Sequence, residues 1–342
     1  MSSSMIRECI VAKTGKVKEL EIGEYEMSFT EQKEVEGVSE SWGHPKQIID
    51  NIDGAEILIV HVAPVTKGVI DAGASLKLIG CCRAGPVNVD VSYATKKGIP
   101  VIYTPGRNAQ GVADLTIGLI IAEARGIARA HAFMKSGVWS VPELGVELWG
   151  KTLGIIGLGN VGSCVAFRAK NGFNMNVLAY DPYVSKERAE ELGAKLVDLE
   201  TLLRESDFVT IHSRAPPDAK PQIVAKHIAL MKPTAYLINT SRGNIVDEQA
   251  LYEALKNDKI AGAALDVYAK EPINSDNPLL KLDNITLTPH IGGLTREVPL
   301  RAAEIIAEDI AKFLKGERPK NIQNPEVFRD CKLEIKRLEG RS

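Results

Sequence analysis

Three polar side chains in the second half of the chain could together perform acid–base chemistry on a 2-oxo acid. Arg242, Glu271 and His290 each follow a short apolar run that is typical of a buried strand. A guanidinium can grip a carboxylate and polarise the neighbouring carbonyl, and an imidazole can give that carbonyl a proton as a hydride arrives. A carboxylate beside the imidazole would orient it and favour its protonated form. Taken singly, each residue has an ordinary alternative: a surface salt bridge, a solvated loop acid or a satisfied histidine.

A glycine-rich turn between two apolar runs could hold the hydride carrier. The run 152–156 leads into GLGNVG, a helical pattern follows, and a second run ends on Asp181. Gly157 permits the tight turn, Gly159 lets a pyrophosphate approach the backbone, and Gly162 lets the helix pack on the strand. The helix N-terminus would hold the phosphates, and Asp181 would accept hydrogen bonds from ribose hydroxyls, which favours NAD over NADP. A glycine-rich turn in some other α/β protein is the alternative.

The elements that must position these residues alternate between strand and helix, which indicates an α/β protein with parallel sheets. Before the glycine-rich turn we predict strands at 6–12, 56–62, 76–82 and 99–103, and helices that include 45–52 and 91–97. After it we predict strands at 208–211, 235–239, 261–266 and 285–288, and helices at 225–231, 247–256 and 295–314. Open parallel sheets bind ligands at the carboxyl ends of their strands, so Arg242, Glu271 and His290 should meet at one edge, beside the nicotinamide ring.

The segment 109–136 is predicted to be one long helix that is apolar around most of its surface. A helix of this kind is usually buried. We therefore expect it to be shared with a second subunit, and a buried helix within a monomer is the alternative.

The composition excludes several classes of function. At 342 residues, the chain is long enough for two domains, and 44% hydrophobic with 25% charged residues describes an ordinary globular protein. A formal net charge of −2 without a basic block gives no reason to expect a nucleic acid or a membrane as partner. The five cysteines lack metal-type spacing, so we expect no metal site and no disulfide framework. Together with an amino terminus that lacks a hydrophobic signal region, this favours a cytoplasmic protein.

From about residue 58 to residue 328, the sequence resembles the D-isomer-specific 2-hydroxyacid dehydrogenases, which include phosphoglycerate dehydrogenase and the glyoxylate and hydroxypyruvate reductases. The resemblance rests on GIIGLGNVG followed by Asp181, on LMKPTAYLINTSRGNIVDEQAL, on AGAALDVYAKEP and on LTPHIGG. It implies that Arg242 binds substrate, that Glu271 pairs with the histidine and that His290 is the acid/base. It also implies an NAD site, with contacts from Gly157, Gly159, Asn160, Val161, Gly162, Asp181, Ser213, Thr240, Ser241, Asp266 and Gly292.

The resemblance also implies how the domains are arranged. A Rossmann NAD-binding domain at residues 108–302 would be inserted into a smaller, flavodoxin-like α/β substrate domain. That substrate domain would consist of residues 1–107 and of the carboxy-terminal helix and tail at 303–342. The family is usually a homodimer that is joined through the long helix.

The loops expected to contact substrate depart from the family pattern. The segment His61-Val62-Ala63-Pro64 stands where phosphoglycerate dehydrogenases carry Arg-Ser-x-Thr to grip phosphate. The usual RxGxGxDNxD loop is here a shorter RAGPVNVD segment that begins at Arg83 and contains a proline, which has no N–H to donate. We expect substrate contacts from His61, Arg83, Ala84 and Gly85, and the alternative is that His61 and Arg83 only fix loop geometry.

The favoured hypothesis is an NAD-dependent oxidoreductase that interconverts a small D-2-hydroxy acid and its 2-oxo acid by hydride transfer. An NAD(H)-sensing binding protein of the corepressor type, on the same fold, is the alternative. Formate oxidation on this scaffold is disfavoured, because those enzymes carry an amide where Glu271 stands.

Overall fold

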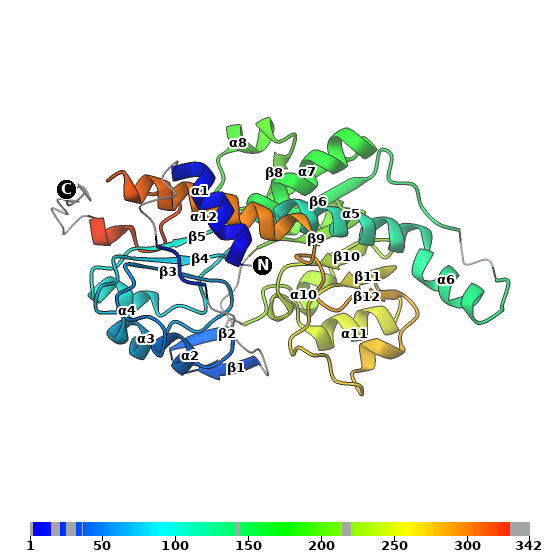
Figure 1. Cartoon of the computed structure of the whole chain (residues 1–342). Coiled ribbons are helices and arrows are strands. Elements are labelled where there is room, and N and C mark those ends of the chain that lie inside the picture. The colour runs from blue at the N-terminus through cyan, green and yellow to red at the C-terminus, as the bar shows by residue number, and fades with distance from the viewer. Residues whose placement is uncertain are drawn as a thin grey trace. The chain divides into compact units, whose positions relative to one another are not determined.

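The computed structural model describes residues 3–14, 21–24, 32–35, 37–140, 144–213 and 220–328, and the chain divides into two compact units (Figure 1). Unit 1 comprises Met1–Arg107 and Arg296–Ser342, and unit 2 comprises Asn108–Thr295. The return to unit 1 therefore precedes helix α12 (Glu297–Leu314), and the expected boundary between residues 302 and 303 falls inside that helix.

Unit 2 is built on a seven-stranded parallel sheet with the order β12-β11-β10-β9-β6-β7-β8. Its strands are β6 (Thr152–Ile156), β7 (Asn176–Tyr180), β8 (Lys195–Leu196), β9 (Phe208–Ile211), β10 (Tyr236–Asn239), β11 (Gly262–Leu265) and β12 (Ile285–Leu287). The chain begins in the middle at β6, runs outward to β8, then returns to β9 beside β6 and continues to β12. This reversal creates the switch point at which doubly wound sheets bind ligands.

Helices cover both faces of this sheet, which is why β9 and β11 are buried at every residue. On one face, α5 (Ala109–Arg125) and α7 (Asn160–Phe173) share an apolar cluster with the strands. On the other, the strands pack on α9 (Leu199–Glu205), α10 (Ala225–Ile228) and α11 (Glu248–Lys256). Unit 2 also contains α8 (Lys186–Glu191) and the 3-10 helices η1 (Gly243–Ile245) and η2 (Pro278–Lys281).

Unit 1 contains a three-stranded parallel sheet, in the order β3 (Ile57–Val60), β4 (Leu78–Cys81), β5 (Val101–Tyr103). Buried residues of α2 (Pro45–Ile49), α3 (Lys67–Ala72) and α4 (Val91–Lys96) form one apolar cluster with this sheet, and those of α1 (Ser3–Thr14) and α12 form a second. An antiparallel ribbon of β1 (Gln32–Val35) and β2 (Val38–Trp42) and the 3-10 helix η3 (Pro325–Phe328) complete the described part of the unit.

The predicted strand at residues 6–12 is wrong, because these residues lie in α1. Ile6, Cys9 and Ile10 belong to the apolar cluster that α1 shares with α12. Their spacing of three and four residues places them on one face of a helix. A short apolar run does not by itself distinguish a strand from a helix, and here the packing against α12 decides.

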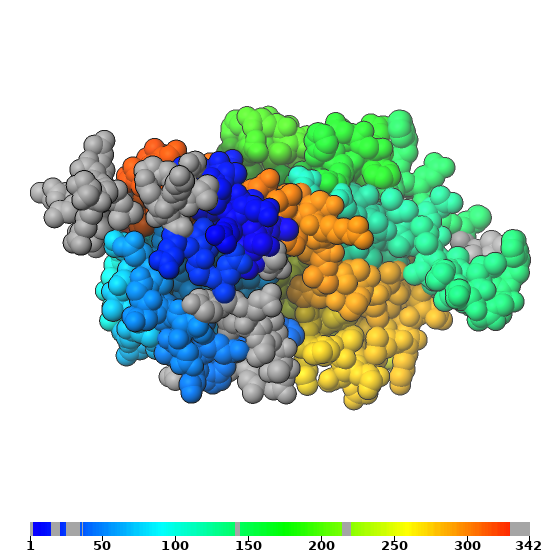
Figure 2. Space-filling model, viewed as in Figure 1, coloured from blue at the N-terminus to red at the C-terminus, as the bar shows by residue number. Residues whose placement is uncertain are grey.

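The single helix predicted at 109–136 is two helices, because Gly126 adopts a left-handed conformation with φ 59° and ends α5. Most of the apolar surface of α5 is buried within unit 2 itself. The following helix, α6 (Ile127–Lys135), has no buried residue and projects from unit 2 (Figures 1 and 2). Within the described ranges, no helix is both long enough and apolar enough to span a membrane.

Candidate active site

His290 and Glu271 lie at the carboxyl edge of the unit 2 sheet, where they form a hydrogen-bonded pair. Glu271 follows β11 and His290 follows β12, and these strands are parallel neighbours in register. His290 Nδ1 lies 2.6 Å from Glu271 Oε2. This hydrogen bond raises the pKa of His290 above its usual value. Burial works to raise the pKa of Glu271, but hydrogen bonds from His290 and from the Tyr268 N–H outweigh it and lower that pKa. The pairing therefore favours the protonated form of His290 and the ionised form of Glu271.

The loop that carries His290 is held by a buried carboxylate, that of Asp266. Asp266 is 1% exposed, and its Oδ1 accepts hydrogen bonds from Thr288 Oγ1 at 2.7 Å and from Ile291 N at 2.8 Å. Its Oδ2 accepts from Gly292 N, also at 2.8 Å. His290 itself has a φ of 53°, a left-handed conformation that costs a non-glycine residue of the order of 1 kcal/mol or more. Asp266 therefore stabilises the strained backbone that presents the imidazole.

Tyr268 also positions this pair, and no sequence pattern had predicted a role for it. Its backbone N–H donates to Glu271 Oε1 at 3.0 Å, and its hydroxyl donates to Thr288 O at 3.0 Å. Burial raises the pKa of this phenol to about 12, so it remains a donor at neutral pH. Tyr268 thus connects the loop after β11 with the end of β12. An aromatic residue between Asp266 and Glu271 was the available signal.

Arg242 follows β10 and lies exposed at the same edge of the sheet. Asn239 shapes the connecting turn, since its Nδ2 donates to Arg242 O at 2.9 Å and its Oδ1 accepts from the Ser241 hydroxyl at 2.8 Å. The next residue must be glycine, because a Cβ on Gly243 would lie 1.8 Å from the carbonyl carbon of Tyr268. The strand ends of β10, β11 and β12 thus bring Arg242, Glu271 and His290 to one edge of unit 2.

The predicted dinucleotide turn joins β6 to α7 at the centre of the sheet. Gly157 has a φ of 94°, and a Cβ on Gly162 would lie 2.1 Å from Gly157 O. Gly159, by contrast, has nothing within 4 Å of the position that a Cβ would take. The tight turn and close packing therefore require glycine at two positions, while Gly159 leaves open space over the start of α7, which fits a pyrophosphate. Asn160 and Val161 form the first turn of that helix.

Asp181 lies at the end of β7 against this turn. Its Oδ2 accepts a hydrogen bond from Leu158 N at 2.8 Å, and its Oδ1 accepts from Tyr183 N at 2.9 Å. The carboxylate is thus fixed beside the glycine-rich turn, in the position that a ribose-binding acid requires.

Two polar side chains after β9 are buried without a full set of partners. Among the residues that the structure describes, His212 Nδ1 and Ser213 Oγ have no hydrogen-bond partner, and burial lowers the pKa of His212 to about 3. Ser213 N would lie 2.6 Å from a Cβ on Gly157, so Ser213 adjoins the dinucleotide turn at the switch point. Buried polar groups are usually satisfied, and a polar ligand at the turn fits these two. His212 was not predicted, although its place directly after a buried strand was a signal.

The other predicted cofactor residues form hydrogen bonds within unit 2. Thr240 Oγ1 lies 2.9 Å from Thr116 Oγ1 of α5, so the Thr240 hydroxyl is bonded to that helix. The Ser241 hydroxyl is bonded to Asn239, and Gly292 N is bonded to Asp266, as described above. A Cβ on Gly292 would lie 3.0 Å from Asp266 Oδ2, which explains the glycine there.

The predicted substrate residues belong to unit 1 and follow its first two parallel strands. His61 Nδ1 lies 3.0 Å from Cys82 O, and burial lowers the pKa of His61 to about 4. Arg83 Nη1 donates to Glu40 O at 2.7 Å, and the guanidinium forms an ion pair with the Glu40 carboxylate. Ala84 and Gly85 continue the same loop and are partly exposed. In unit 1, these contacts fix the loop geometry around His61 and Arg83.

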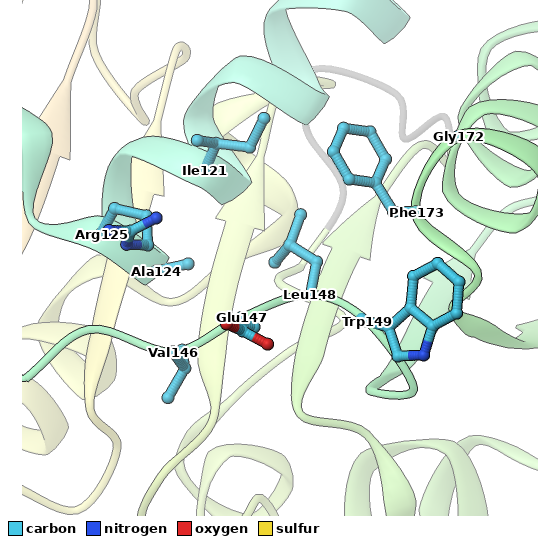
Figure 3. A pocket seen from close by; sticks show the side chains of 9 residues that line it. All are labelled: Ile121, Ala124, Arg125, Val146, Glu147, Leu148, Trp149, Gly172 and Phe173. Atoms are coloured by element: carbon cyan, nitrogen blue, oxygen red, sulfur yellow. The ribbon is translucent and has the colours of Figure 1, made fainter.

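A cavity of about 290 Å³ lies elsewhere in unit 2, at the carboxyl ends of α5 and α7 (Figure 3). None of the polar residues described above lines it. Its walls come from three segments: Ile121, Ala124 and Arg125; Val146, Glu147, Leu148 and Trp149; and Gly172 and Phe173. Its lining is mostly apolar, so this cavity is unsuited to the acid–base chemistry of the sheet edge.

Comparison with known proteins agrees with this geometry. Residues 117–292 match the family model described as D-isomer specific 2-hydroxyacid dehydrogenase, NAD binding domain. The chain is 46% identical over 282 residues to a D-3-phosphoglycerate dehydrogenase of Methanocaldococcus jannaschii, covering 82% of this chain and 53% of that protein. It is 41% identical over 290 residues to a glyoxylate reductase of Korarchaeum cryptofilum, covering 83% of this chain and 87% of that protein. The chain thus spans about half the length of the phosphoglycerate dehydrogenases that it matches.

A solved structure of a related enzyme shares the fold of this chain. The D-lactate dehydrogenase from Aquifex aeolicus, complexed with NAD and lactic acid, is 32% identical with a TM-score of 0.66, covering 82% of this chain and 87% of that one. The predicted α/β fold with a Rossmann NAD-binding domain is confirmed by these matches together with the strand order of unit 2.

Proposed function

The chain belongs to the family of D-isomer specific 2-hydroxyacid dehydrogenases, and from this premise we propose that it is an NAD-dependent oxidoreductase acting on a small D-2-hydroxy acid and its 2-oxo acid. The observation that carries the proposal is the hydrogen bond of 2.6 Å between His290 Nδ1 and Glu271 Oε2. It lies at the carboxyl edge of the same sheet whose central turn fits a dinucleotide. An oriented imidazole whose protonated form is favoured is what proton transfer to a carbonyl requires.

In the proposed reaction, His290 is the acid and base. NAD held at the glycine-rich turn would supply or accept the hydride at C2 of the substrate. Since Nδ1 is held by Glu271, Nε2 is the nitrogen that gives its proton to the carbonyl oxygen during reduction and takes it back during oxidation. Glu271 stabilises the imidazolium before the transfer and fixes the plane of the ring.

We assign Arg242 to the substrate carboxylate. Its guanidinium lies exposed at the sheet edge and donates from Nη1 to Ser241 O at 2.8 Å, which orients the planar fork. A forked guanidinium binds a carboxylate through two parallel hydrogen bonds and polarises an adjacent carbonyl. Arg242 would thereby place the reacting carbon against the nicotinamide.

The cofactor proposed for this site is NAD, held mainly by unit 2. The pyrophosphate would lie over Gly159 at the start of α7, and Asp181 would accept hydrogen bonds from the ribose. The remaining contacts are proposed for Gly157, Asn160, Val161, Gly162, Ser213, Thr240, Ser241, Asp266 and Gly292. A 2′-phosphate would meet the negative charge of Asp181, so NADP is disfavoured.

Unit 1 is proposed to recognise the substrate side chain. The candidates are His61, Arg83 and the backbone of Ala84 and Gly85, at the carboxyl ends of β3 and β4. In unit 1, these positions lie at the carboxyl edge of the parallel sheet, just as the proposed acid and base do in unit 2.

We propose further that the protein is a homodimer joined through unit 2. Several large apolar side chains of α6 and the segment after it are exposed: Phe133 42%, Met134 54%, Trp139 84%, Leu144 99% and Trp149 70%. The apolar cavity in Figure 3 adjoins this surface at Trp149. Exposed apolar patches of this kind mark interaction sites, and a second copy of the chain would cover one.

The protein is also proposed to be cytoplasmic. All cysteines in the described ranges are free, namely Cys9, Cys81, Cys82 and Cys164. Free thiols, two of them buried and two partly buried, fit a reducing compartment.

The test is turnover of NADH by the purified protein with a panel of 2-oxo acids that includes glyoxylate, hydroxypyruvate and 2-oxoglutarate. We expect at least one to be reduced, and His290→Ala to lower kcat by about 10²- to 10⁴-fold with NADH binding nearly unchanged. His131→Ala, at an exposed position on α6, serves as the control. Saturable NADH binding without oxidation by any 2-oxo acid would overturn the proposal and favour an NAD(H)-sensing binding protein.

A further inference from the structure

Glu123 of α5 is a buried carboxylate that takes no part in the proposed reaction. The residue is 1% exposed, and its side chain has no exposed surface. Its Oε2 lies beside Gly262 at the start of β11, where a Cβ would come within 2.6 Å of it. A buried charge is costly unless it is paired, so the partners of Glu123 show what this carboxylate holds in place.

One oxygen of Glu123 anchors the strand that precedes His290. Glu123 Oε1 accepts a hydrogen bond from the hydroxyl of Thr286, the middle residue of β12. This strand has three residues and stands at the end of the strand order, beside β11. An edge strand receives its ladder hydrogen bonds from one side, so a side-chain anchor matters more for it than for a central strand. His290 follows Thr286 closely in the chain, and its place depends on this strand.

The other oxygen of Glu123 holds α6. Arg129 Nη1 lies 3.4 Å from Glu123 Oε2, and it also donates to Asp283 O, in the loop before β12, at 3.1 Å. The helix begins directly after the left-handed Gly126 and has no buried residue, so apolar packing does little to fix its direction. Arg129 therefore ties α6 to the rest of unit 2.

The carboxylate depends on both partners. Burial raises the pKa of Glu123, whereas the hydrogen bond from Thr286 and the charge of Arg129 work to lower it. The net shift is upward, so even with both partners in place the ionised form is costly. Each partner is thus connected to the other through one buried group.

We propose that Glu123 is a positioning residue that joins β12 to α6: Oε1 holds the strand that presents His290, and Oε2 holds the helix that carries the proposed dimer surface. The inference rests on the proposed function for the roles of His290 and α6. It adds a mechanical connection, within unit 2, between the acid/base and the surface that a second copy of the chain would cover.

Hydrogen exchange of the backbone amides tests each contact separately. Thr286→Val removes the hydroxyl with little change in shape, and it should speed exchange in β12 by about tenfold or more while leaving α6 unchanged. Arg129→Met should do the reverse, and Glu123→Ala should speed exchange in both elements. Thr234→Val and Arg204→Met make the same substitutions at exposed positions and should alter neither element.

Glu123→Gln separates the two roles of the carboxylate and replaces Glu123→Ala if that variant does not fold. Its amide oxygen can still accept from Thr286, but it offers no charge to Arg129. We therefore expect faster exchange in α6 and unchanged exchange in β12. If Thr286→Val and Arg129→Met each affect both elements equally, or if neither variant changes exchange, the inference is overturned.

Kinetics distinguish positioning of His290 from a general loss of structure. Thr286→Val should lower kcat for the best 2-oxo acid by about tenfold or more and leave the Kd for NADH within about twofold, because the imidazole shifts while the dinucleotide turn at β6 does not. Glu123→Gln should keep kcat within about threefold, since it keeps the anchor of β12. Equal losses of kcat and NADH affinity in Thr286→Val would contradict the positioning role.

The exchange measurement does not depend on the proposed function. If no 2-oxo acid is reduced, or if the wild-type protein is a monomer, that part of the proposed function fails. The pattern of exchange in β12 and α6 then still decides whether Glu123 joins the two elements.

Discussion

At the scale of single residues, His290 and Glu271 act as one titrating unit. The pKa of His290 is raised and that of Glu271 is lowered, so the ion pair exists between these two values. Its contribution to stability is lost as the pH rises through the pKa of His290, and again as the pH falls through that of Glu271. Because the two side chains are 47% and 34% exposed, solvent screens the pair and the contribution to stability stays small. The pairing therefore affects the rate of the reaction, through the protonation of His290, more than it affects stability.

Glu271→Gln should move the pH profile of reduction to lower pH. Reduction needs a protonated His290, and the Glu271 hydrogen bond is the largest cause that raises its pKa. With an amide in that place, His290 loses its proton at a lower pH, so kcat/KM declines earlier as the pH rises. The measurement is kcat/KM for 2-oxo acid reduction across pH 5–9. An unchanged profile would mean that Glu271 does not set the proton affinity of His290.

Asp181→Asn should relax the preference for NADH over NADPH by about tenfold or more, because the charge that opposes a 2′-phosphate is gone. Asparagine is preferred to alanine here, since Asp181 accepts hydrogen bonds from Leu158 N and Tyr183 N and an amide oxygen keeps one of them. Asp258→Asn, at an exposed turn position with φ 52° that asparagine tolerates, is the control. If Asp181→Asn leaves the ratio of kcat/KM for NADH to that for NADPH unchanged, another residue selects the cofactor.

At the scale of elements, the turn between β6 and α7 depends on close contact between backbones. A Cβ on Gly162 would lie 2.1 Å from Gly157 O, which forces the helix and the strand apart. The loop of His290 depends in a similar way on Asp266, whose two oxygens accept three hydrogen bonds from one short segment. Both sets of contacts fix a loop to the end of a strand. The rigid sheet therefore sets the positions of the proposed cofactor site and of the imidazole.

Gly162→Ala should lower the free energy of unfolding by about 2 kcal/mol or more and weaken NADH binding, because the helix start must shift. Gly118→Ala is the matched control in α5, where a Cβ would meet nothing within 4 Å. That substitution should stabilise the protein by about 0.5–1 kcal/mol, since alanine is the better helix former. Chemical denaturation and NADH titration of both variants check the pair. Equal stability of the two variants would contradict the packing argument.

At the scale of the whole molecule, the two units divide the proposed work. Unit 2 carries the dinucleotide turn and the acid–base pair, and unit 1 carries the proposed substrate residues His61 and Arg83 at its own strand ends. Each unit has apolar clusters of its own. Both therefore present functional residues from the carboxyl edge of a parallel sheet, which is a rigid platform.

Trp139→Glu should weaken the proposed dimer by about 100-fold or more, because a charge replaces a large aromatic anchor at the interface. Trp139 is 84% exposed in the single chain and follows α6 closely. Leu280→Asp, which alters an exposed apolar residue of η2, is the control. Sedimentation equilibrium should show a dimer for the wild type and for the control. A wild-type protein that sediments as a monomer would rule out this assembly.

The sequence by itself determined the dinucleotide unit, because a strand, a glycine turn, a helix and an acid are defined by local spacing. It also determined that Arg242, Glu271 and His290 meet at one edge, since parallel strands carry their carboxyl ends to the same side. Only the tertiary structure decided that residues 6–12 are helical, because packing against α12 selects between two conformations that suit a short apolar run.

Tertiary structure also decided what individual polar groups do. The family resemblance gave Asp266 as a contact of NAD, and the structure adds that both of its oxygens accept hydrogen bonds from the loop that presents His290. No spacing predicted that Glu40 holds the Arg83 guanidinium, because the two residues are 43 positions apart in the sequence. Strand, turn and helix patterns depend on residues that are close together in the sequence, so the sequence reveals them. Burial and charge balance depend on residues that only folding brings together.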